Sequence, residues 1–222
     1  MAKPRMWIFD LDDTLYAERS YVLSALRFAG AMVSDLYVVA DAALFLTDAF
    51  ERGDADPILS LWQAQDLPLA AKAAVVAAMR AHRPAVSLYA GAGAVLDQQR
   101  DKPVGFGIMT DGRSLTQRAK LAALGCLDAR AILISEESGW HKPDPQCYAF
   151  FATRFPDVAF GYVGDNPAKD FVGARAAGWE TVMLVDQGHN VHSQTEQRPR
   201  HFHAAHTATT WHKIGELLDA LP

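Results

Sequence analysis

Short apolar runs alternate with amphipathic helical segments along most of this chain. The runs of strand length are Met6–Phe9, Val104–Met109, Ala131–Ile134, Ala159–Val163 and Thr181–Val185. The segments with helical spacing that accompany them are Ala94–Arg100, Ser114–Leu124, Pro145–Phe155 and Pro167–Ala177. Strands that alternate with helices form parallel sheets with right-handed crossovers. The pattern therefore predicts an α/β fold with an open, doubly wound parallel sheet.

The stretch between the first two apolar runs contains only helical patterns. Apolar residues at Val22, Leu26, Ala29 and Val33 predict a helix capped by Ser20. Further helices are expected at Asp41–Phe50, from Asp56-Pro57 onward, and at Ala70–Ala81. We therefore expect a helical insertion at residues 16–87, with residues 1–15 and 88–222 forming the core that carries the sheet.

The region after the last apolar run is polar. Gln187–His206 is rich in turn-forming residues and is predicted to be a loop, and a final helix is expected at about Thr210–Leu221. Six of the eight histidines lie between His189 and His212. Their spacing matches no structural zinc pattern, so we interpret this region as a solvated loop.

Composition narrows the class of protein. The 222 residues are 50% hydrophobic with a net charge of -5, and the basic residues are scattered, which argues against a nucleic-acid interface. No apolar stretch is long enough to span a bilayer, and no signal sequence is recognisable. The two cysteines have neither metal-binding nor redox spacing. We expect a cytoplasmic enzyme or binding protein with no membrane partner.

Polar residues follow four of the predicted strands at the point where each strand ends. They are Asp10, Asp12 and Asp13; Thr110 and Asp111; Lys142; and Asp165, Asn166 and Asp170. Ligands of open α/β sheets bind at the carboxyl ends of the strands. Because the four groups converge on that edge, we expect them to form one site.

These residue types suit phosphoryl transfer. Several carboxylates at one point favour a hard cation such as Mg²⁺, which also binds phosphate oxygens. A lysine supplies a positive charge to phosphate, and a threonine supplies a hydroxyl donor. An aspartate can act as the nucleophile, and a second carboxyl group nearby can protonate the leaving oxygen.

Four motifs in order carry a resemblance to a known family. They are Asp-Leu-Asp-Asp-Thr-Leu at residues 10–15, Thr-Asp-Gly at 110–112, Lys-Pro-Asp-Pro at 142–145, and Gly-Asp-Asn-Pro-Ala-Lys-Asp at 164–170. The chain resembles the haloacid dehalogenase superfamily, and within it the Mg²⁺-dependent phosphatases with an aspartyl nucleophile. The resemblance implies a Rossmann-like core, with residues 16–87 as a small helical cap.

The resemblance also implies a role for each motif residue. Asp10 would be the nucleophile and a metal ligand; Asp12 would be the general acid and base, and would bind Mg²⁺ through its carbonyl. Thr110, the backbone at Asp111, and Lys142 would hold the phosphoryl group. Asp165 would bind the metal, with Asn166 and Asp170 in support. True dehalogenases lack an acid at the position of Asp12, so a phosphatase is favoured.

One position departs from the usual pattern. Many relatives have Asn where this chain has Asp111, and we expect the added charge to face away from phosphate or to pair with Arg113. Lys169 is expected to be a solvated helix charge and Asp13 a residue that stabilises its loop.

The resulting hypothesis is a Mg²⁺-dependent phosphatase that acts on a small phosphorylated metabolite. A phosphomutase would use the same residues and return the phosphoryl group to a sugar. A non-catalytic switch that carries a phospho-aspartate, similar to a receiver domain, is the alternative from another class. The sequence leaves the substrate and the oligomeric state open.

Overall fold

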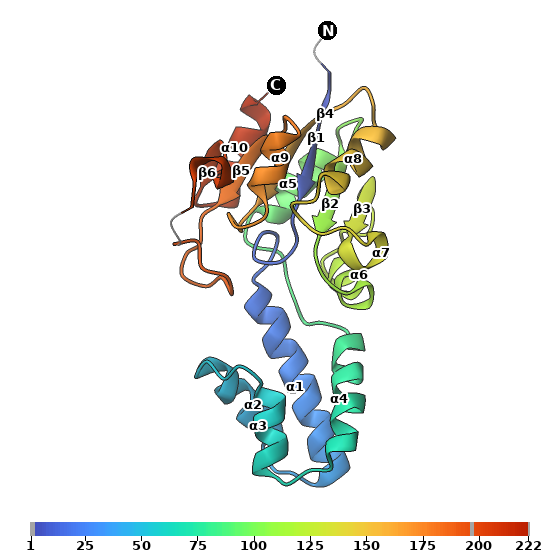
Figure 1. The fold of residues 1–222 in the computed structure, drawn as a ribbon, viewed down its shortest axis with the longest axis vertical. Helices are drawn as coiled ribbons and strands as arrows, with labels where there is room; N and C mark the ends of the chain where they lie inside the picture. Colours follow the sequence, from blue (N-terminus) through green and yellow to red (C-terminus); the bar gives the residue numbers. More distant parts are fainter. Residues whose placement is uncertain (1–2, 196–197, 222) are drawn as a thin grey trace. The chain divides into compact units, whose positions relative to one another are not determined.

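The computed structural model describes residues 3–195 and 198–221 (Figure 1). The chain forms two compact units: Met1–Glu18 joined with Ser87–Pro222, and Arg19–Val86. The first unit carries the sheet, and the second consists of helices. We call them the core unit and the helical unit. A role of the helical unit as a cap stays a prediction.

The core unit is built on a six-stranded sheet in which every pairing is parallel. The strands are β1 (Arg5–Phe9), β2 (Phe106–Thr110), β3 (Ala131–Ile134), β4 (Ala159–Gly164), β5 (Glu180–Leu184) and β6 (His206–Ala208). Their order is β3-β2-β1-β4-β5-β6, so the chain reverses its direction across the sheet between β1 and β4. The predicted doubly wound α/β fold is confirmed.

Strand β6 was not predicted: it begins at His206, the last residue of the expected loop, and ends at Ala208, before the expected final helix. It has three residues, and only Ala208 is buried. A strand this short and polar gives no recognisable period, because its pairing with β5 rather than its own hydrophobicity holds it in place.

Central strand β1 is buried on both faces. Met6 and Ile8 belong to one apolar cluster, together with Tyr148 and Phe151. On the other face the Phe9 ring lies 5.9 Å from that of Trp211. Gly161 in the neighbouring strand is required by packing, since a Cβ there would collide with the Trp7 ring. Burial of both faces explains why the sequence here is continuously apolar rather than alternating.

Helices cover both faces of the sheet. They are α5 (Ala92–Arg100), α6 (Ser114–Ala123), α7 (Ser135–Ser138), α8 (Pro145–Arg154), α9 (Phe171–Ala176), the 3-10 turn η1 (Arg200–Phe202) and α10 (Trp211–Ala220). Helix α9 begins at Phe171, four residues later than predicted. Asn166 causes the difference, because its side chain accepts a hydrogen bond from Ala168 N and holds the preceding residues in a turn.

The helical unit has its own apolar core. Its helices are α1 (Glu18–Tyr37), α2 (Ala42–Glu51), α3 (Pro57–Ala64) and α4 (Leu69–Ala81). Leu26 and Val33 of α1 pack in this core with Leu61 and Trp62 of α3. The expected start of α3 is confirmed: the Asp56 side chain accepts a hydrogen bond from Leu59 N. The expected cap at Ser20 is wrong, because α1 already begins at Glu18.

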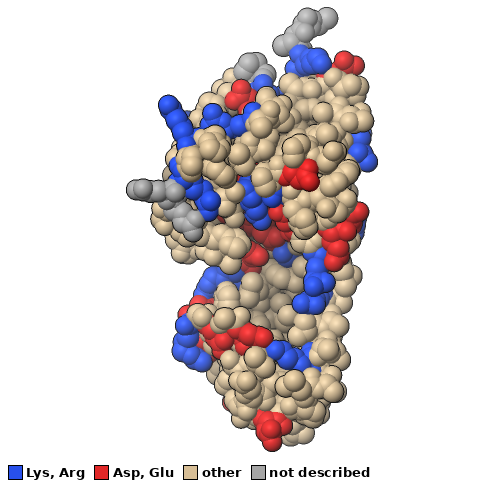
Figure 2. Space-filling model, viewed as in Figure 1, with Lys and Arg blue, Asp and Glu red and all other residues tan. Residues whose placement is uncertain are grey.

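Charged side chains are dispersed on the surface. On the face drawn in Figure 2, Lys and Arg side chains are interspersed with Asp and Glu, without a continuous basic area. Within residues 3–195 and 198–221, no helix combines the length and the apolar character needed to cross a bilayer.

Candidate active site

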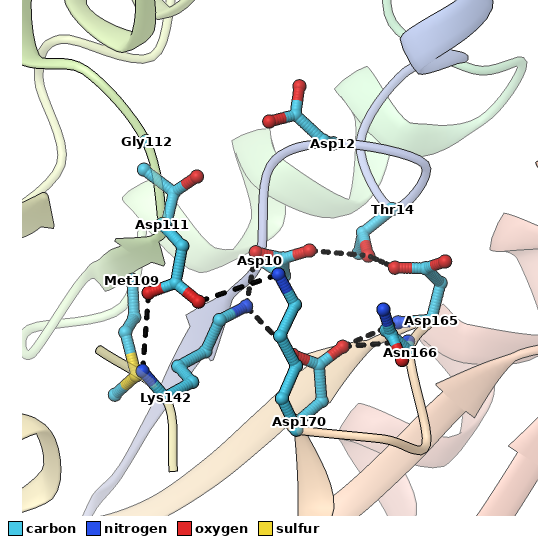
Figure 3. Close-up of polar contacts among 12 residues, drawn as sticks. Asp10, Asp12, Thr14, Met109, Asp111, Gly112, Lys142, Asp165, Asn166 and Asp170 are labelled. Carbon is cyan, nitrogen blue, oxygen red and sulfur yellow. Dashed lines mark hydrogen bonds and ion pairs between the residues drawn. The ribbon is translucent and has the colours of Figure 1, made fainter. Parts of the chain in front are cut away.

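Asp10 lies directly after β1, where the order of the strands reverses. Its backbone N–H donates to the carbonyl of Val163 at 2.9 Å, which extends the pairing of β1 with β4 by one residue. The Asp10 carboxylate is therefore held at the middle of the carboxyl edge, the place where open α/β sheets bind ligands. It is buried, and Figure 3 shows it at the centre of the polar cluster.

Lys142 neutralises part of the charge at this point. Its ammonium group lies 2.6 Å from Asp10 Oδ1 and 2.7 Å from Asp170 Oδ1, and donates to the Tyr162 hydroxyl at 3.0 Å. The Lys142 side chain is only 1% exposed. Burial by itself would lower the pKa of Lys142, but Asp10 and Asp170 outweigh it and hold that pKa well above its ordinary value. The lysine is a permanent cation.

The turn after β4 is organised by Asp170. One of its oxygens, Oδ2, accepts hydrogen bonds from Asn166 N at 2.8 Å and Asp165 N at 3.2 Å. This aims the Asp165 carboxylate toward Asp10, and the Thr14 hydroxyl donates to both, at 3.3 Å and 3.5 Å (Figure 3). The motif residues after β1 and β4 are thus brought together.

The buried carboxylates carry more negative charge than Lys142 compensates. Asp10, Asp165 and Asp170 each offer an oxygen, and the three atoms lie within 4.8 Å of one another. Burial and then repulsion from Asp170 raise the pKa of Asp165 to about 9, and burial raises that of Asp10 to about 6 despite Lys142. Surplus charge on oxygen ligands fits a divalent cation. The described part of the chain holds no comparable cluster of histidines.

Asp12 lies in a different environment from Asp10. Its Oδ1 accepts hydrogen bonds from Lys120 Nζ at 2.7 Å and from the Tyr16 hydroxyl, and its Oδ2 accepts one from Gln117 Nε2 at 2.8 Å. Burial alone would raise the pKa of Asp12, but Lys120 and these hydrogen bonds outweigh it and lower that pKa. In Figure 3 the Asp12 carboxylate points away from the cluster around Asp10.

Gln117 and Lys120 were not singled out from the sequence. They lie three residues apart on α6, on its buried face, although both are polar. Gln117 Nε2 also lies 2.6 Å from Thr110 Oγ1 and 3.1 Å from the Asp111 carbonyl, so it links the first two motifs. Two polar residues at helical spacing, where an apolar face was expected, are the signal that could have found them.

Asp111 lines the cavity, but its carboxylate is engaged by two nitrogen groups. Its Oδ1 accepts a hydrogen bond from Lys142 N at 3.2 Å, and its Oδ2 lies 3.4 Å from Lys169 Nζ. The expected pairing with Arg113 is wrong, because that residue lies 3.7 Å from Glu136. Lys169 is likewise not a solvated helix charge: it belongs to the turn before α9 and lines the site.

A polar cavity of about 170 Å³ opens over these groups. It is lined by Asp10, Asp12, Asp13, Glu18, Thr110, Asp111, Asp165, Asn166, Lys169 and His192. Asp13 stabilises its loop as expected, since it accepts hydrogen bonds from Glu18 N and Val191 N. Glu18 was not predicted here, and burial followed by repulsion from Asp12 raises its pKa to about 7. The cavity has room for a phosphate group beside Asp10.

Comparison with known proteins identifies the family of this chain. The family model for haloacid dehalogenase-like hydrolases matches residues 7–184. A phosphoserine phosphatase from Thermus thermophilus is 39% identical over 105 residues, which cover 46% of this chain but only 41% of that enzyme. A glyceraldehyde 3-phosphate phosphatase from Methanopyrus kandleri is 31% identical over 192 residues, which cover 80% of this chain and 82% of that enzyme.

A solved structure shares the fold. The HAD-hydrolase YfnB from Bacillus subtilis, bound to magnesium, aligns with a TM-score of 0.68 over 98% of this chain and 99% of its own, at 18% identity. At this identity the likeness concerns the fold alone. The match of the family model over most of the chain, together with the relative from Methanopyrus kandleri, shows the family: this protein is a haloacid dehalogenase-like hydrolase.

Proposed function

We propose that this hydrolase is a Mg²⁺-dependent phosphatase that cleaves a small phosphomonoester through an aspartyl-phosphate on Asp10. The observation that carries the proposal is the position of the Asp10 carboxylate, between the Lys142 ammonium and Asp165 at the floor of a polar cavity. The names of the two relatives, both phosphatases of small molecules, support the same class of reaction.

The first chemical step would transfer the phosphoryl group to the protein. An oxygen of Asp10 attacks phosphorus, and the bond between phosphorus and the ester oxygen breaks. Asp12 gives its proton to that oxygen, so the product leaves as a neutral alcohol. In the second step Asp12 takes a proton from water while the water oxygen attacks phosphorus. This releases inorganic phosphate, regenerates the Asp10 carboxylate and returns Asp12 to its protonated form.

The surrounding residues would bind the phosphoryl oxygens and the metal ion. Lys142 and the Thr110 hydroxyl would hold phosphoryl oxygens, together with the backbone N–H of Asp111. Asp10, Asp165 and the Asp12 carbonyl would hold Mg²⁺, which supplies positive charge where two anions, carboxylate and phosphate, must meet. Both oxygens of Asp170 are already engaged, by Lys142 and by two backbone N–H groups, so Asp170 and Asn166 support the ligands.

Asp12 must change its contacts to act as the acid. Its carboxylate is held by Lys120, Gln117 and Tyr16, and not by residues of the cluster around Asp10. We therefore expect the Asp12 side chain to rotate away from Lys120 when substrate occupies the cavity. Closure of the helical unit over the substrate, as a cap that excludes water, would accompany this change.

The test is a phosphate-release assay of the purified full chain with Mg²⁺, a generic phosphate ester and a panel of small phosphoesters. Asp10→Asn should lower the rate by about 10³-fold or more, the scale expected for loss of a covalent nucleophile. Asp144→Asn is the matched control, because Asp144 caps α8 and does not line the cavity.

Three outcomes would contradict the proposal. Undiminished turnover by Asp10→Asn would exclude the aspartyl-phosphate route. A sugar-phosphate isomer formed without free phosphate would identify a phosphomutase. A phospho-aspartate that persists without turnover would identify a switch.

A further inference from the structure

The loop after β5 returns to the active site. Its first turn is shaped by Asp186, whose Oδ1 accepts hydrogen bonds from the backbone N–H groups of Gly188, His189 and Asn190 at 2.7, 2.8 and 3.1 Å. Three donors on one oxygen define the conformation of this turn. The position of Asn190 is therefore set by the backbone and not by its own side chain.

Gln194 ties the far end of the same loop to the sheet. Its amide nitrogen donates to the carbonyls of Asp165 at 2.7 Å and Leu184 at 2.9 Å, and its amide oxygen accepts from Asp186 N at 2.8 Å. The segment from Asp186 to Gln194 is thus fastened at both ends, and one of its attachments is the backbone of Asp165. We call this segment the β5 loop.

The β5 loop places one side chain on a proposed metal ligand. Asn190 Nδ2 donates to Asp165 Oδ2 at 2.8 Å, while the other oxygen of Asp165 faces Thr14 and Asp10. The next residue, Val191, donates its backbone N–H to Asp13 Oδ2 at 2.7 Å. The loop therefore contacts both motif segments that flank the carboxylate cluster.

We propose that Asn190 is a positioning residue for the metal site, on which the proposed function also rests. The terminal torsion of an aspartate is soft, so its carboxylate plane is not fixed by the chain alone. A donor on Oδ2 fixes that plane and leaves Oδ1 directed at Asp10. Removing a hydrogen-bond partner of a metal ligand typically lowers metal affinity or activity 10–100-fold.

The chemistry of an amide fits this task. A second carboxylate beside Asp165 would add to charge that is already in surplus, and a lysine would compete with the cation for the same oxygens. A neutral donor orients the ligand without either effect. The polar segment after β5 therefore has a specific role at the site, although its sequence contains no recognisable functional motif.

The experiment measures binding of Mg²⁺ to the full-length protein by isothermal titration calorimetry. Asn190→Leu keeps the size of the side chain and removes the donor, and its Kd for Mg²⁺ should rise about tenfold. Val191→Ala is the matched control on the same loop, because this residue is 46% exposed and the variant keeps its backbone contact. Its Kd for Mg²⁺ should change less than about twofold. Asn190→Ser serves if the leucine variant does not fold.

A kinetic readout separates positioning from a general loss of structure. For Asn190→Leu the Mg²⁺ concentration that gives half-maximal activity should rise with its Kd, while kcat at saturating Mg²⁺ approaches that of the wild type. The Tm in the presence of a chelator should stay within about 2 °C of the wild type, since an exposed loop contributes little to stability.

The outcomes distinguish the two proposals. A wild-type protein that binds no divalent cation would overturn the proposed function and this inference with it. A wild type that binds Mg²⁺, with an unchanged or lower Kd in Asn190→Leu and Asn190→Ser, would overturn the inference alone.

Discussion

Asp10 and Asp12 lie two residues apart in the segment after β1, but their hydrogen-bond partners, charged neighbours and pKa shifts differ. Asp10 shares one lysine with Asp170 and faces Asp165, and its pKa is raised to about 6, by burial first. Asp12 accepts hydrogen bonds from Lys120 and from two further donors, and its pKa is lowered even though burial acts in the opposite direction. The three donors that stabilise the ionised form of Asp12 distinguish its surroundings from those of Asp10.

The difference assigns a task to each region. Surplus negative charge around Asp10 suits a site that is completed by a metal ion, whereas the Asp12 carboxylate is already stabilised by Lys120 and two further donors. Two carboxyl groups held in unlike environments are the usual basis for dividing acid-base roles between them. The comparison can be tested by removing one charge at a time from each region.

The largest effect is expected for Lys142→Met. This change leaves Asp10 and Asp170 buried without a cation, and breaking such a buried ion pair costs about 3–5 kcal/mol. For a chain of this length the loss corresponds to about 10 °C or more in Tm, which thermal unfolding measures directly. Lys169→Met is the control: its pair with Asp111 is longer and the lysine is 33% exposed, so less than about 1 kcal/mol should be lost. Equal losses would refute the assignment.

Lys120→Met tests the other region. The Lys120 side chain is 4% exposed, but Asp12 is 20% exposed and keeps its hydrogen bonds from Tyr16 and Gln117, so we expect a smaller loss of about 1–3 kcal/mol. The pKa of Asp12 should rise without the ammonium, which moves the Asp12 limb of the kcat/KM profile to higher pH. Arg118→Met on the same helix removes only an exposed pair with Glu137 and should leave the profile unchanged. An unshifted limb in Lys120→Met would show that Asp12 does not govern it.

The pH dependence of stability should reveal the surplus charge around Asp10. Asp165 and Asp10 have pKa values in the folded protein, about 9 and about 6, above their ordinary value of 3.8, so the folded state binds protons more strongly than the unfolded state. Stability without metal should therefore fall as the pH rises from about 4 through 9. Mg²⁺ should offset this loss, so its stabilising effect should grow with pH.

The measurement compares Tm in Mg²⁺ with Tm in a chelator at each pH. Between pH 6 and 9 the difference should widen by about 3–6 °C, which corresponds to about 1–2 kcal/mol for a protein of this size. Contributions from distant groups cancel in the difference. In Asp165→Asn this Tm difference should depend less on pH. A Tm difference that is independent of pH in the wild type would contradict the idea that uncompensated carboxylates surround Asp10.

The smallest effect is expected for Asp111→Asn, which restores the residue that is usual at this position. The amide oxygen can still accept the hydrogen bond from Lys142 N, and only the attraction of Lys169 is lost. Stability should change by less than about 0.5–1 kcal/mol, and kcat/KM by no more than a few-fold. A loss comparable to that of Lys142→Met would show that the Asp111 charge itself organises the loop.

The order of the first five strands and their connecting helices, the parallel sheet and the four groups of polar residues at its edge could all be predicted from the sequence, whereas β6 could not. The prediction was possible because apolar period and strand ends are local signals, and because parallel strands must bring their carboxyl ends to one edge. The start of α3 at Asp56-Pro57 belongs to the same class, since a cap and a first-turn proline act within one turn of helix.

Which charged groups compensate one another depends on the tertiary structure and could not be predicted from the sequence. Lys120 and Gln117 come to Asp12 from a helix more than 100 residues away in the chain, and Asn190 comes to Asp165 from a loop without a recognisable pattern. The same is true of Asp111, which pairs with Lys169 rather than with its near neighbour Arg113. Charge compensation depends on distance and burial in space, and neither quantity is encoded in local spacing along the chain.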